Sequence, residues 1–483
     1  MTERLLPPHP LVVTGRRAAA RALAATSTGS WRLATAAALV LGGAAAGWRS
    51  PAAPDYLQLA TGAEIWRRAG AMFMAAPEGS LDLRSWLAAL LILGLHHAAG
   101  AAGLVALTVG LGAVFGLLLG AAGWRAGAHP LALALGGGMA LLALGQLPAT
   151  ASTYWLAALG AAALLLLAEV RRGRRLALVG MVLLGALWAN LESAAVVLPP
   201  ALLLLAVADR LGSAERRIPW LLAPATAVAV MLNPQGPWIY ARLPLSLGQG
   251  GEHPALALWS SPNFHPWSMR MVELAALLLL ASYLVAAPRL RPGDALVGLL
   301  GAGASLLWAF YLPLLVATEG VQVPGLLTPR PWRSGRVGAA RGATLALVLP
   351  VLALLGLGIS AARLGGRAAE GTIPAGAVAY LGSAGGVWYT TSALGDYLAA
   401  DFPQGRHLMC VTDAPAAGPA RLETCQSLSQ LSSGTMARLR ESGVRLAVLP
   451  PADPAVAFLH AQGWRTRYRD GVVAVLTPPP SGL

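Results

Sequence analysis

Residues 153–190 decide the fold, and they read TYWLAALGAAALLLLAEVRRGRRLALVGMVLLGALWAN. Two apolar runs, 153–168 and 176–190, stand on either side of a short arginine cluster. Each run is long enough, or nearly so, to cross about 30 Å of hydrocarbon. Arginine is enriched in the cytoplasmic loops between membrane helices. The stretch therefore predicts two membrane spans joined by a cytoplasmic turn.

The same alternation of apolar runs and short polar loops continues through most of the chain. Of the 483 residues, 56% are hydrophobic and 12% are charged, whereas soluble globular proteins carry about 25% charged residues. The predicted fold class is mainly α, a polytopic transmembrane helical bundle of about eleven spans followed by a small α/β soluble domain. The spans are expected near 33–48, 102–121, 128–145, 153–168, 176–190, 194–208, 218–232, 271–287, 295–309, 311–326 and 342–361.

Arginine also sets the predicted orientation. The formal net charge is +14, and the chain contains no lysine. Because the arginines form short clusters between apolar runs, they indicate membrane topology and argue against a nucleic-acid partner. The clusters at 171–175, 210–217, 289–291 and 330–341 are expected to face the cytoplasm. This alternation puts the N-terminal segment 1–32 in the cytoplasm and the C-terminal domain outside.

Two stretches after the first span are not typical of membrane-spanning helices. Residues 54–70 carry Asp55, Gln58, Thr61 and Glu64 at a spacing of three to four residues, which predicts an amphipathic helix in the membrane interface. Residues 82–98 are apolar but short, so they form a second interfacial helix or a short span. A span there would turn every later arginine cluster outward, so we favour the interfacial helix within a membrane region of 33–361.

The composition changes after residue 362. Short β-rich runs alternate with helical stretches, and Asp470-Gly471 marks the turn of a hairpin. Residues 362–483 are therefore expected to form an extracytoplasmic α/β domain. Both cysteines, Cys410 and Cys425, fall in it; a disulfide between them is one possibility, and two free thiols are the other.

Polar groups near the predicted outward face are the candidates for chemistry, because such groups are costly at membrane depth. For each of these groups, a purely structural role is an alternative to a functional one. The turn at Asn233-Pro234-Gln235-Gly236 can be purely structural, and Asp55 can be a helix cap. Arg67 and Arg68 can simply meet lipid headgroups.

Several short segments follow one another in order along nearly the whole chain. They are Leu59-Ala60-Thr61-Gly62, Trp86-Leu87, Trp188-Ala189-Asn190-Leu191, Asn233-Pro234-x-Gly236, Ser261-Pro262-Asn263-Phe264-His265, Leu394-Gly395-Asp396-Tyr397-Leu398 and residues 444–451. In their order and spacing they resemble a family of bacterial polytopic membrane proteins related to GT-C-type glycosyltransferases, which use lipid-linked sugar donors at the outer face of the cytoplasmic membrane.

The resemblance implies transfer of a sugar from a polyprenyl-phosphate donor to an unknown extracytoplasmic acceptor, with membrane lipid as a further partner. Asp55 would be the general base or hold a divalent metal ion, with Glu192 as the second catalytic candidate. Arg67 and Arg68 would bind the donor phosphate. The remaining substrate-binding candidates are Glu64, Asn190, Asn233, Glu252, His253, His265 and Arg270.

The chain also departs from the family pattern. Gln58 stands where a histidine is usual, Arg84-Ser85 replaces a His-Glu pair, and Glu192 replaces another histidine. A catalytically inactive relative that acts in envelope assembly is therefore an alternative. A transporter is a further alternative, disfavoured because the chain has no internal repeat and its charges gather at one face.

Overall fold

The computed structural model describes residues 34–48, 53–68, 85–148, 150–211, 218–241, 261–328, 374–402, 408–410, 425, 431 and 434–479. The predicted cytoplasmic segment 1–32 and the predicted span 342–361 lie outside these residues, as do Glu252 and His253. The C-terminal half of the predicted helix 54–70 is described as backbone, but the side chains of Glu64, Arg67 and Arg68 are not.

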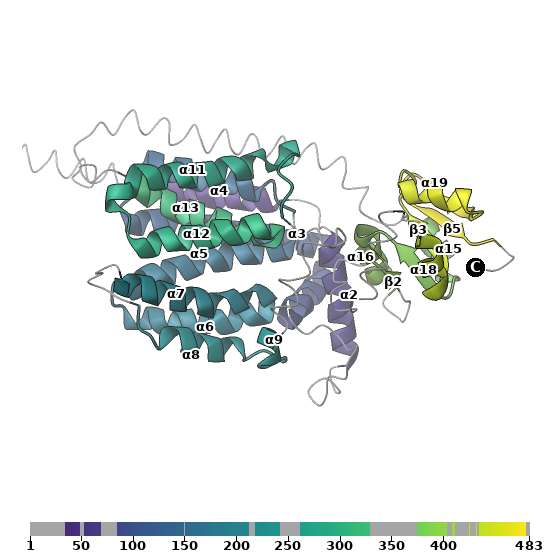
Figure 1. The fold of residues 1–483 in the computed structure, drawn as a ribbon, viewed down its shortest axis with the longest axis horizontal. Coiled ribbons are helices and arrows are strands. Elements are labelled where there is room, and N and C mark those ends of the chain that lie inside the picture. Colours follow the sequence, from purple (N-terminus) through teal and green to yellow (C-terminus); the bar gives the residue numbers. More distant parts are fainter. Residues whose placement is uncertain are drawn as a thin grey trace, which may run out of the picture.

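Helices dominate the described chain up to residue 328, and they lie side by side in a bundle (Figure 1). The first is Ala34–Gly47. The following helices are α2 (Ala53–Arg68), α3 (Trp86–Ala126), α4 (Pro130–Leu144), α5 (Ala151–Arg171), α6 (Arg175–Leu191), α7 (Leu198–Leu211), α8 (Leu222–Val230), α9 (Trp238–Ala241), α11 (Arg270–Ala286), α12 (Pro292–Leu307) and α13 (Leu312–Leu326).

Among the described residues, two helices are long and apolar enough to cross a membrane, α3 and α5. The helix Ala34–Gly47 and helices α4, α6 and α12 are apolar but shorter. Two large buried cores stabilise the bundle, and a smaller one joins α2, α3 and the start of α5. One large core is centred on α5, α6 and α7, and the other on α3, α4, α5 and α13. The predicted mainly helical class is confirmed, while the number of spans stays a prediction.

Helix α3 bends where the sequence separates a short apolar stretch from the next predicted span. Ala99 and Gly100 have non-helical dihedral angles, and Gly100 has φ +57°, a conformation that glycine adopts without steric cost. Residues 86–98 and 101–126 are thus two helical pieces of different direction. The helix predicted at 54–70 is also present, as α2.

Two predicted spans have different bounds in the structure. The region 194–208 begins with the 3₁₀ segment Ser193–Val197, and helix α7 starts only at Leu198, next to Pro199 and Pro200. The predicted span 218–232 contains helix α8, which has only 9 residues and is therefore roughly 13 Å long at 1.5 Å per residue. That length is too short to cross the hydrocarbon layer alone, so the helix is shorter than the span predicted for this region.

Small residues let the first helix lie directly against α3. A Cβ atom at Gly112 would fall 2.1 Å from the Gly43 carbonyl oxygen, and one at Gly116 would fall 2.1 Å from the Leu39 carbonyl oxygen. Such a close approach of backbones is what small residues at four-residue spacing permit in membrane helices. Gly112 and Gly116 of α3 therefore face the helix Ala34–Gly47.

The C-terminal domain is a five-stranded mixed sheet with helices on it (Figure 1). Its strand order is β2-β1-β3-β5-β4; β1 pairs in parallel with β2 and β3, and β5 pairs antiparallel with β3 and β4. The elements are α15 (Ala375–Gly382), β1 (Val387–Thr390), α16 (Ser392–Asp401), β2 (Leu408–Met409), α18 (Thr435–Glu441), β3 (Val444–Leu449), α19 (Pro454–Ala461), β4 (Arg465–Arg469) and β5 (Ala474–Thr477).

Alternate residues of the central strands feed two cores, one on each face of the sheet. Trp388 and Val448 belong to one buried cluster, whereas Tyr389 and Leu449 belong to the other. This is the period-two pattern of a strand buried on both faces. Burial raises the pKa of Tyr389, and the nearby charge of Asp453 raises it further.

The predicted hairpin is confirmed as β4 and β5. Asp470 shapes its turn, because its Oδ1 atom accepts hydrogen bonds from the Val472 and Val473 N–H groups, each at 2.7 Å. Partial burial acts to raise the pKa of Asp470, but these bonds and one from the Tyr468 hydroxyl keep it below its usual value.

Helix α2 lies crosswise at one end of the bundle, between the bundle and the sheet domain (Figure 1). It packs on α3 on one side and on α16 of the sheet domain on the other. A Cβ atom at Gly62 would fall 2.4 Å from the Ala89 carbonyl oxygen, so α2 and α3 are in close contact. The C-terminal domain therefore sits at the end of the bundle that α2 covers.

Candidate functional site

The N-terminus of α5 is the meeting point of the two carboxylates predicted to be catalytic. Thr150 caps this helix and accepts a hydrogen bond from the Thr153 N–H group at 3.1 Å. Asp55, which lies in the first turn of α2, reaches the same place: its Oδ1 atom accepts the Ala151 N–H at 2.8 Å. The positive end of the α5 dipole favours a carboxylate there.

Asp55 is thus buried, with 2% of its surface exposed. The alternative considered from the sequence was that it caps a helix, and it does accept a backbone N–H at a helix start. The helix it serves is α5, however, which begins 96 residues further along the chain. The Asp55 carboxylate therefore joins α2 to the bundle, independently of any catalytic role.

Glu192 approaches α5 from the other side. It follows the last residue of α6, and its Oε2 atom accepts a hydrogen bond from the Ser152 hydroxyl at 2.5 Å. It is 5% exposed, and it lies near enough to the Tyr311 hydroxyl for an electrostatic interaction. Asp55 and Glu192 therefore bind adjacent residues, Ala151 and Ser152.

The two asparagines of the predicted site hold the ends of α6 and α8 together. Asn190 accepts a hydrogen bond from Trp86 Nε1 at 2.5 Å and donates to the Leu232 carbonyl at 2.9 Å. Asn233 donates to the Ala189 carbonyl at 2.6 Å. The segments around Trp86, Asn190 and Asn233, distant in sequence, therefore meet at the same end of the bundle as Glu192.

His265 lies in the segment before α11, Arg270 is the first residue of that helix, and the contacts described for both are local. The His265 ring hydrogen-bonds to Asn263 Oδ1 at 2.9 Å, and the residue is exposed. Arg270 forms an ion pair with Glu273 at 2.7 Å, one turn further along the same helix. These contacts give both residues an ordinary structural role, and their assignment to the substrate stays a prediction.

The opposite end of α5 has the reverse charge. Arg171 binds Asp209 through two nitrogen atoms, at 2.9 and 3.1 Å, and Asp294 at 2.7 Å. Glu169 is 5% exposed and pairs with Arg125, Arg172 and Arg174. We call this group of seven residues the arginine end, and the residues Asp55, Ala151, Ser152 and Glu192 the acidic end.

A divalent metal needs several oxygen or nitrogen ligands with the right spacing. Within the residues that the structure describes, no group of three or more histidine, cysteine, aspartate or glutamate side chains could hold a metal ion. The acidic end offers two carboxylates, each with a hydrogen-bond donor of the protein against it. The assignment of Asp55 as a general base or as a metal ligand stays a prediction.

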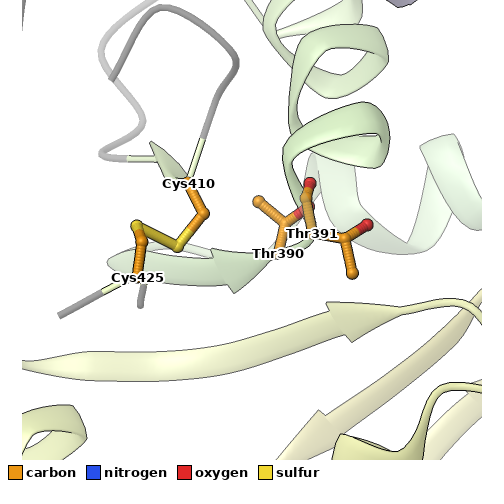
Figure 2. Close-up of a disulfide and its surroundings, with 4 residues drawn as sticks. All are labelled: Thr390, Thr391, Cys410 and Cys425. Atoms are coloured by element: carbon orange, nitrogen blue, oxygen red, sulfur yellow. A yellow bond between two sulfur atoms is a disulfide. The ribbon is translucent and has the colours of Figure 1, made fainter. Parts of the chain in front are cut away.

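Cys410 and Cys425 are joined in a disulfide, with an S–S distance of 2.14 Å (Figure 2). Both are buried in the core on one face of the sheet. Cys410 directly follows β2, and Figure 2 shows the bond beside Thr390 and Thr391 at the end of β1. Disulfides persist in oxidising compartments such as the extracytoplasmic space, where this domain is expected to lie.

Ser152 was absent from the residues predicted for the site. Its signal was present in the sequence, because Thr150-Ala151-Ser152-Thr153 stands directly before an apolar run and is typical of a helix start. What the sequence did not reveal is that two distant carboxylates bind this helix start.

The comparisons with known proteins are sparse. No protein-family model matches the chain, and no curated protein matches it. Among solved structures, the cryo-EM structure of the arabinofuranosyltransferase AftD from mycobacteria is similar, with 17% sequence identity and a TM-score of 0.43. The match covers 93% of this chain and 40% of that one, so this chain spans less than half the length of that enzyme.

Proposed function

We propose that this protein is a membrane glycosyltransferase that moves a sugar from a polyprenyl-phosphate donor to an extracytoplasmic acceptor. The observation that carries the proposal is the convergence of Asp55 and Glu192 on Ala151 and Ser152. Two buried carboxylates at one end of a helical bundle, beneath the crosswise helix α2, are suited to general-base chemistry.

The reaction would proceed as a direct displacement at the sugar. The acceptor hydroxyl loses its proton to Asp55 as its oxygen forms a bond to the anomeric carbon, and the bond from that carbon to the phosphate oxygen breaks. The polyprenyl phosphate leaves with the electron pair. Arg67 and Arg68, near the C-terminal end of α2, would bind its negative charge.

The proposed location is the cytoplasmic (inner) membrane of a bacterium, with the acidic end and the disulfide-bonded domain outside. The arginine end would face the cytoplasm, as the preference of arginine for cytoplasmic loops requires. Two cysteine variants test this orientation: Arg175→Cys at the start of α6, next to the arginine end, and Asn263→Cys in the segment that precedes α11. An impermeant thiol reagent applied outside should label only the second, and labelling of the first would reverse the topology.

The activity is tested with Asp55→Asn, which retains an oxygen to accept the Ala151 N–H but removes the base. We expect transfer from a polyprenyl-phosphate sugar to fall by 10²-fold or more, about the lower limit for general-base catalysis, with insertion unchanged. The matched control is Asp453→Asn, a helix-capping aspartate of the C-terminal domain, which should retain transfer. Full activity of Asp55→Asn would overturn the base assignment.

A second candidate function, a catalytically inactive envelope assembly protein, is favoured by one specific observation. Both carboxylates are at most 5% exposed and each is engaged by a group of the protein itself. In that case Asp55→Asn and the unaltered chain would show equal, background levels of transfer, while a polyprenyl-phosphate sugar would still bind intact.

A further inference from the structure

A cavity of about 220 Å³ opens at the arginine end, between helices α3, α5, α12 and α13. Its polar lining comes from Arg125, Arg171, Arg172, Asp294 and Gln322. Its remaining walls are aliphatic, including Leu164, Leu165, Val297 and Val321. The cavity therefore combines a cationic rim with an apolar interior.

Among the seven described residues of the arginine end, positive charges outnumber negative ones. Four guanidinium groups, Arg125, Arg171, Arg172 and Arg174, face three carboxylates, Glu169, Asp209 and Asp294. Arg171 is matched by its two aspartates, so the excess lies around Glu169, which three arginines share. A guanidinium group has five N–H donors, and Arg125 contacts Glu169 through Nε only among the ion pairs described.

Exposure puts the unbalanced arginines at the mouth of the cavity. The Arg125 and Arg172 side chains are 44% and 39% exposed, whereas Arg171 is 10% exposed. Arg172 is further held in place by a hydrogen bond from Nη2 to the Arg125 carbonyl at 2.9 Å. The Arg125 and Arg172 guanidinium groups both contact Glu169 Oε1, at 3.2 and 2.5 Å, so they lie side by side at the mouth of the cavity.

We propose that this cavity binds the phosphate-bearing headgroup of an anionic membrane lipid. Arginine pairs are suited to phosphate, and basic pockets between membrane helices on the cytoplasmic side take anionic headgroups. The aliphatic walls suit the glycerol and first methylene groups of a lipid better than a free ion. The volume is below the roughly 300–1,000 Å³ of sites for drug-sized ligands, as expected if only the headgroup enters.

The test uses the full chain in nanodiscs of phosphatidylcholine, with and without phosphatidylglycerol. The proposal rests on the membrane location given under the proposed function, and stable incorporation into phosphatidylcholine alone checks that location separately. Phosphatidylglycerol should raise the melting temperature in a saturable manner. In Arg125→Gln/Arg172→Gln the apparent affinity should fall roughly tenfold or more, as expected for the loss of two charge-assisted contacts.

Two further variants keep the test informative if the double variant fails to fold. Ala168→Phe should remove the effect by filling the cavity without changing any charge, since Ala168 lines it and is exposed. Arg291→Gln is the matched control, because Arg291 is exposed at the start of α12 and is absent from the lining; it should retain the effect.

Three outcomes would overturn the proposal. The first is that phosphatidylglycerol has no effect on the unaltered chain. The second is that Arg291→Gln loses as much affinity as the double variant, which would indicate diffuse charge attraction. The third is that inorganic phosphate reproduces the whole effect in phosphatidylcholine, which would indicate a site for a soluble anion. None of these readings depends on sugar transfer, so the proposed activity is judged separately.

Discussion

Helix α5 carries opposite charges at its two ends, and each end is completed by residues from elsewhere in the chain. Its N-terminus receives the carboxylates of Asp55 and Glu192, while its C-terminus ends in Arg171, which two aspartates surround. With 21 residues it spans roughly 30 Å, which is about the thickness of the hydrocarbon layer. The arrangement matches the helix dipole at both ends.

The two ends differ in the contacts that the structure describes there. At the acidic end, Asp55 accepts a hydrogen bond from the Ala151 N–H and Glu192 accepts one from the Ser152 hydroxyl. At the arginine end, Arg171 forms ion pairs with Asp209 and Asp294. Substitutions at a helix start and in a buried ion pair differ in their cost, so the two ends are expected to respond differently.

The largest expected effect follows from removing the charge that organises the arginine end. Arg171→Met leaves Asp209, which is 5% exposed, without its partner. Breaking a buried ion pair from one side costs about 3–5 kcal/mol, which we expect as the loss in free energy of unfolding in detergent micelles. Arg171→Met/Asp209→Leu should recover much of it. A loss below about 1 kcal/mol in the single variant would mean that the ion pair is dispensable.

Glu319, in the middle of α13, is a carboxylate whose removal is expected to stabilise the protein, in contrast to the removal of Arg171. It is fully buried in α13, and its carboxylate oxygens have no hydrogen-bond partner in the described structure. Glu319→Leu should therefore stabilise the bundle by about 1–3 kcal/mol, the cost of an unsatisfied buried polar group.

Thermal unfolding of Glu319→Leu beside Thr318→Val checks this. Thr318 is the adjacent residue, and its hydroxyl donates to the Leu314 carbonyl at 2.7 Å, so Thr318→Val should not stabilise. Destabilisation by Glu319→Leu would show that the carboxyl group contributes to the fold.

Asp55→Ala weakens the acidic end by removing an acceptor from the start of α5. We expect a loss of about 0.5–2 kcal/mol, as for other helix caps, and less for Asp55→Asn, because the amide oxygen still accepts the Ala151 N–H. Chemical denaturation of both variants gives the comparison. Equal losses would mean that the charge and its interaction with the helix dipole account for the whole effect.

The smallest effect is expected at the exposed ion pair of α11. Arg270 and Glu273 are 43% and 27% exposed, and pairs of this kind contribute at most about 0.2–1 kcal/mol. Arg270→Gln should therefore leave the melting temperature almost unchanged. If transfer falls in this variant while stability does not, Arg270 acts on the substrate and is more than a surface ion pair.

Local patterns made several elements predictable. The amphipathic spacing from Asp55 to Glu64 predicted α2, and Asp470-Gly471 predicted the β4–β5 turn. The break in α3 at Gly100 was indicated by the gap between the apolar runs 82–98 and 102–121. The length of α8 was not predictable in this way, because hydropathy does not reveal where a short helix ends inside an apolar run.

The candidate site was only partly predictable, because its contacts join residues far apart in the chain. The sequence indicated Asp55, Asn190, Glu192 and Asn233 as candidates, because they are polar residues near the ends of apolar runs. It did not indicate that Asp55 contacts Ala151 or that Trp86 contacts Asn190. Those pairs are separated by 96 and 104 residues. The same holds for Arg171 and Asp294, 123 residues apart.

The sequence by itself determined the approximate position of most helices and which ends carry arginine, because apolar runs and charge clusters are properties of consecutive residues. Only the tertiary structure decided which carboxylate serves which helix terminus. That depends on α2 lying crosswise over the start of α5, and on α6 ending beside it. Helix α5 could present the same termini to many partners, and the packing of its neighbours selected acids for one end and paired arginines for the other.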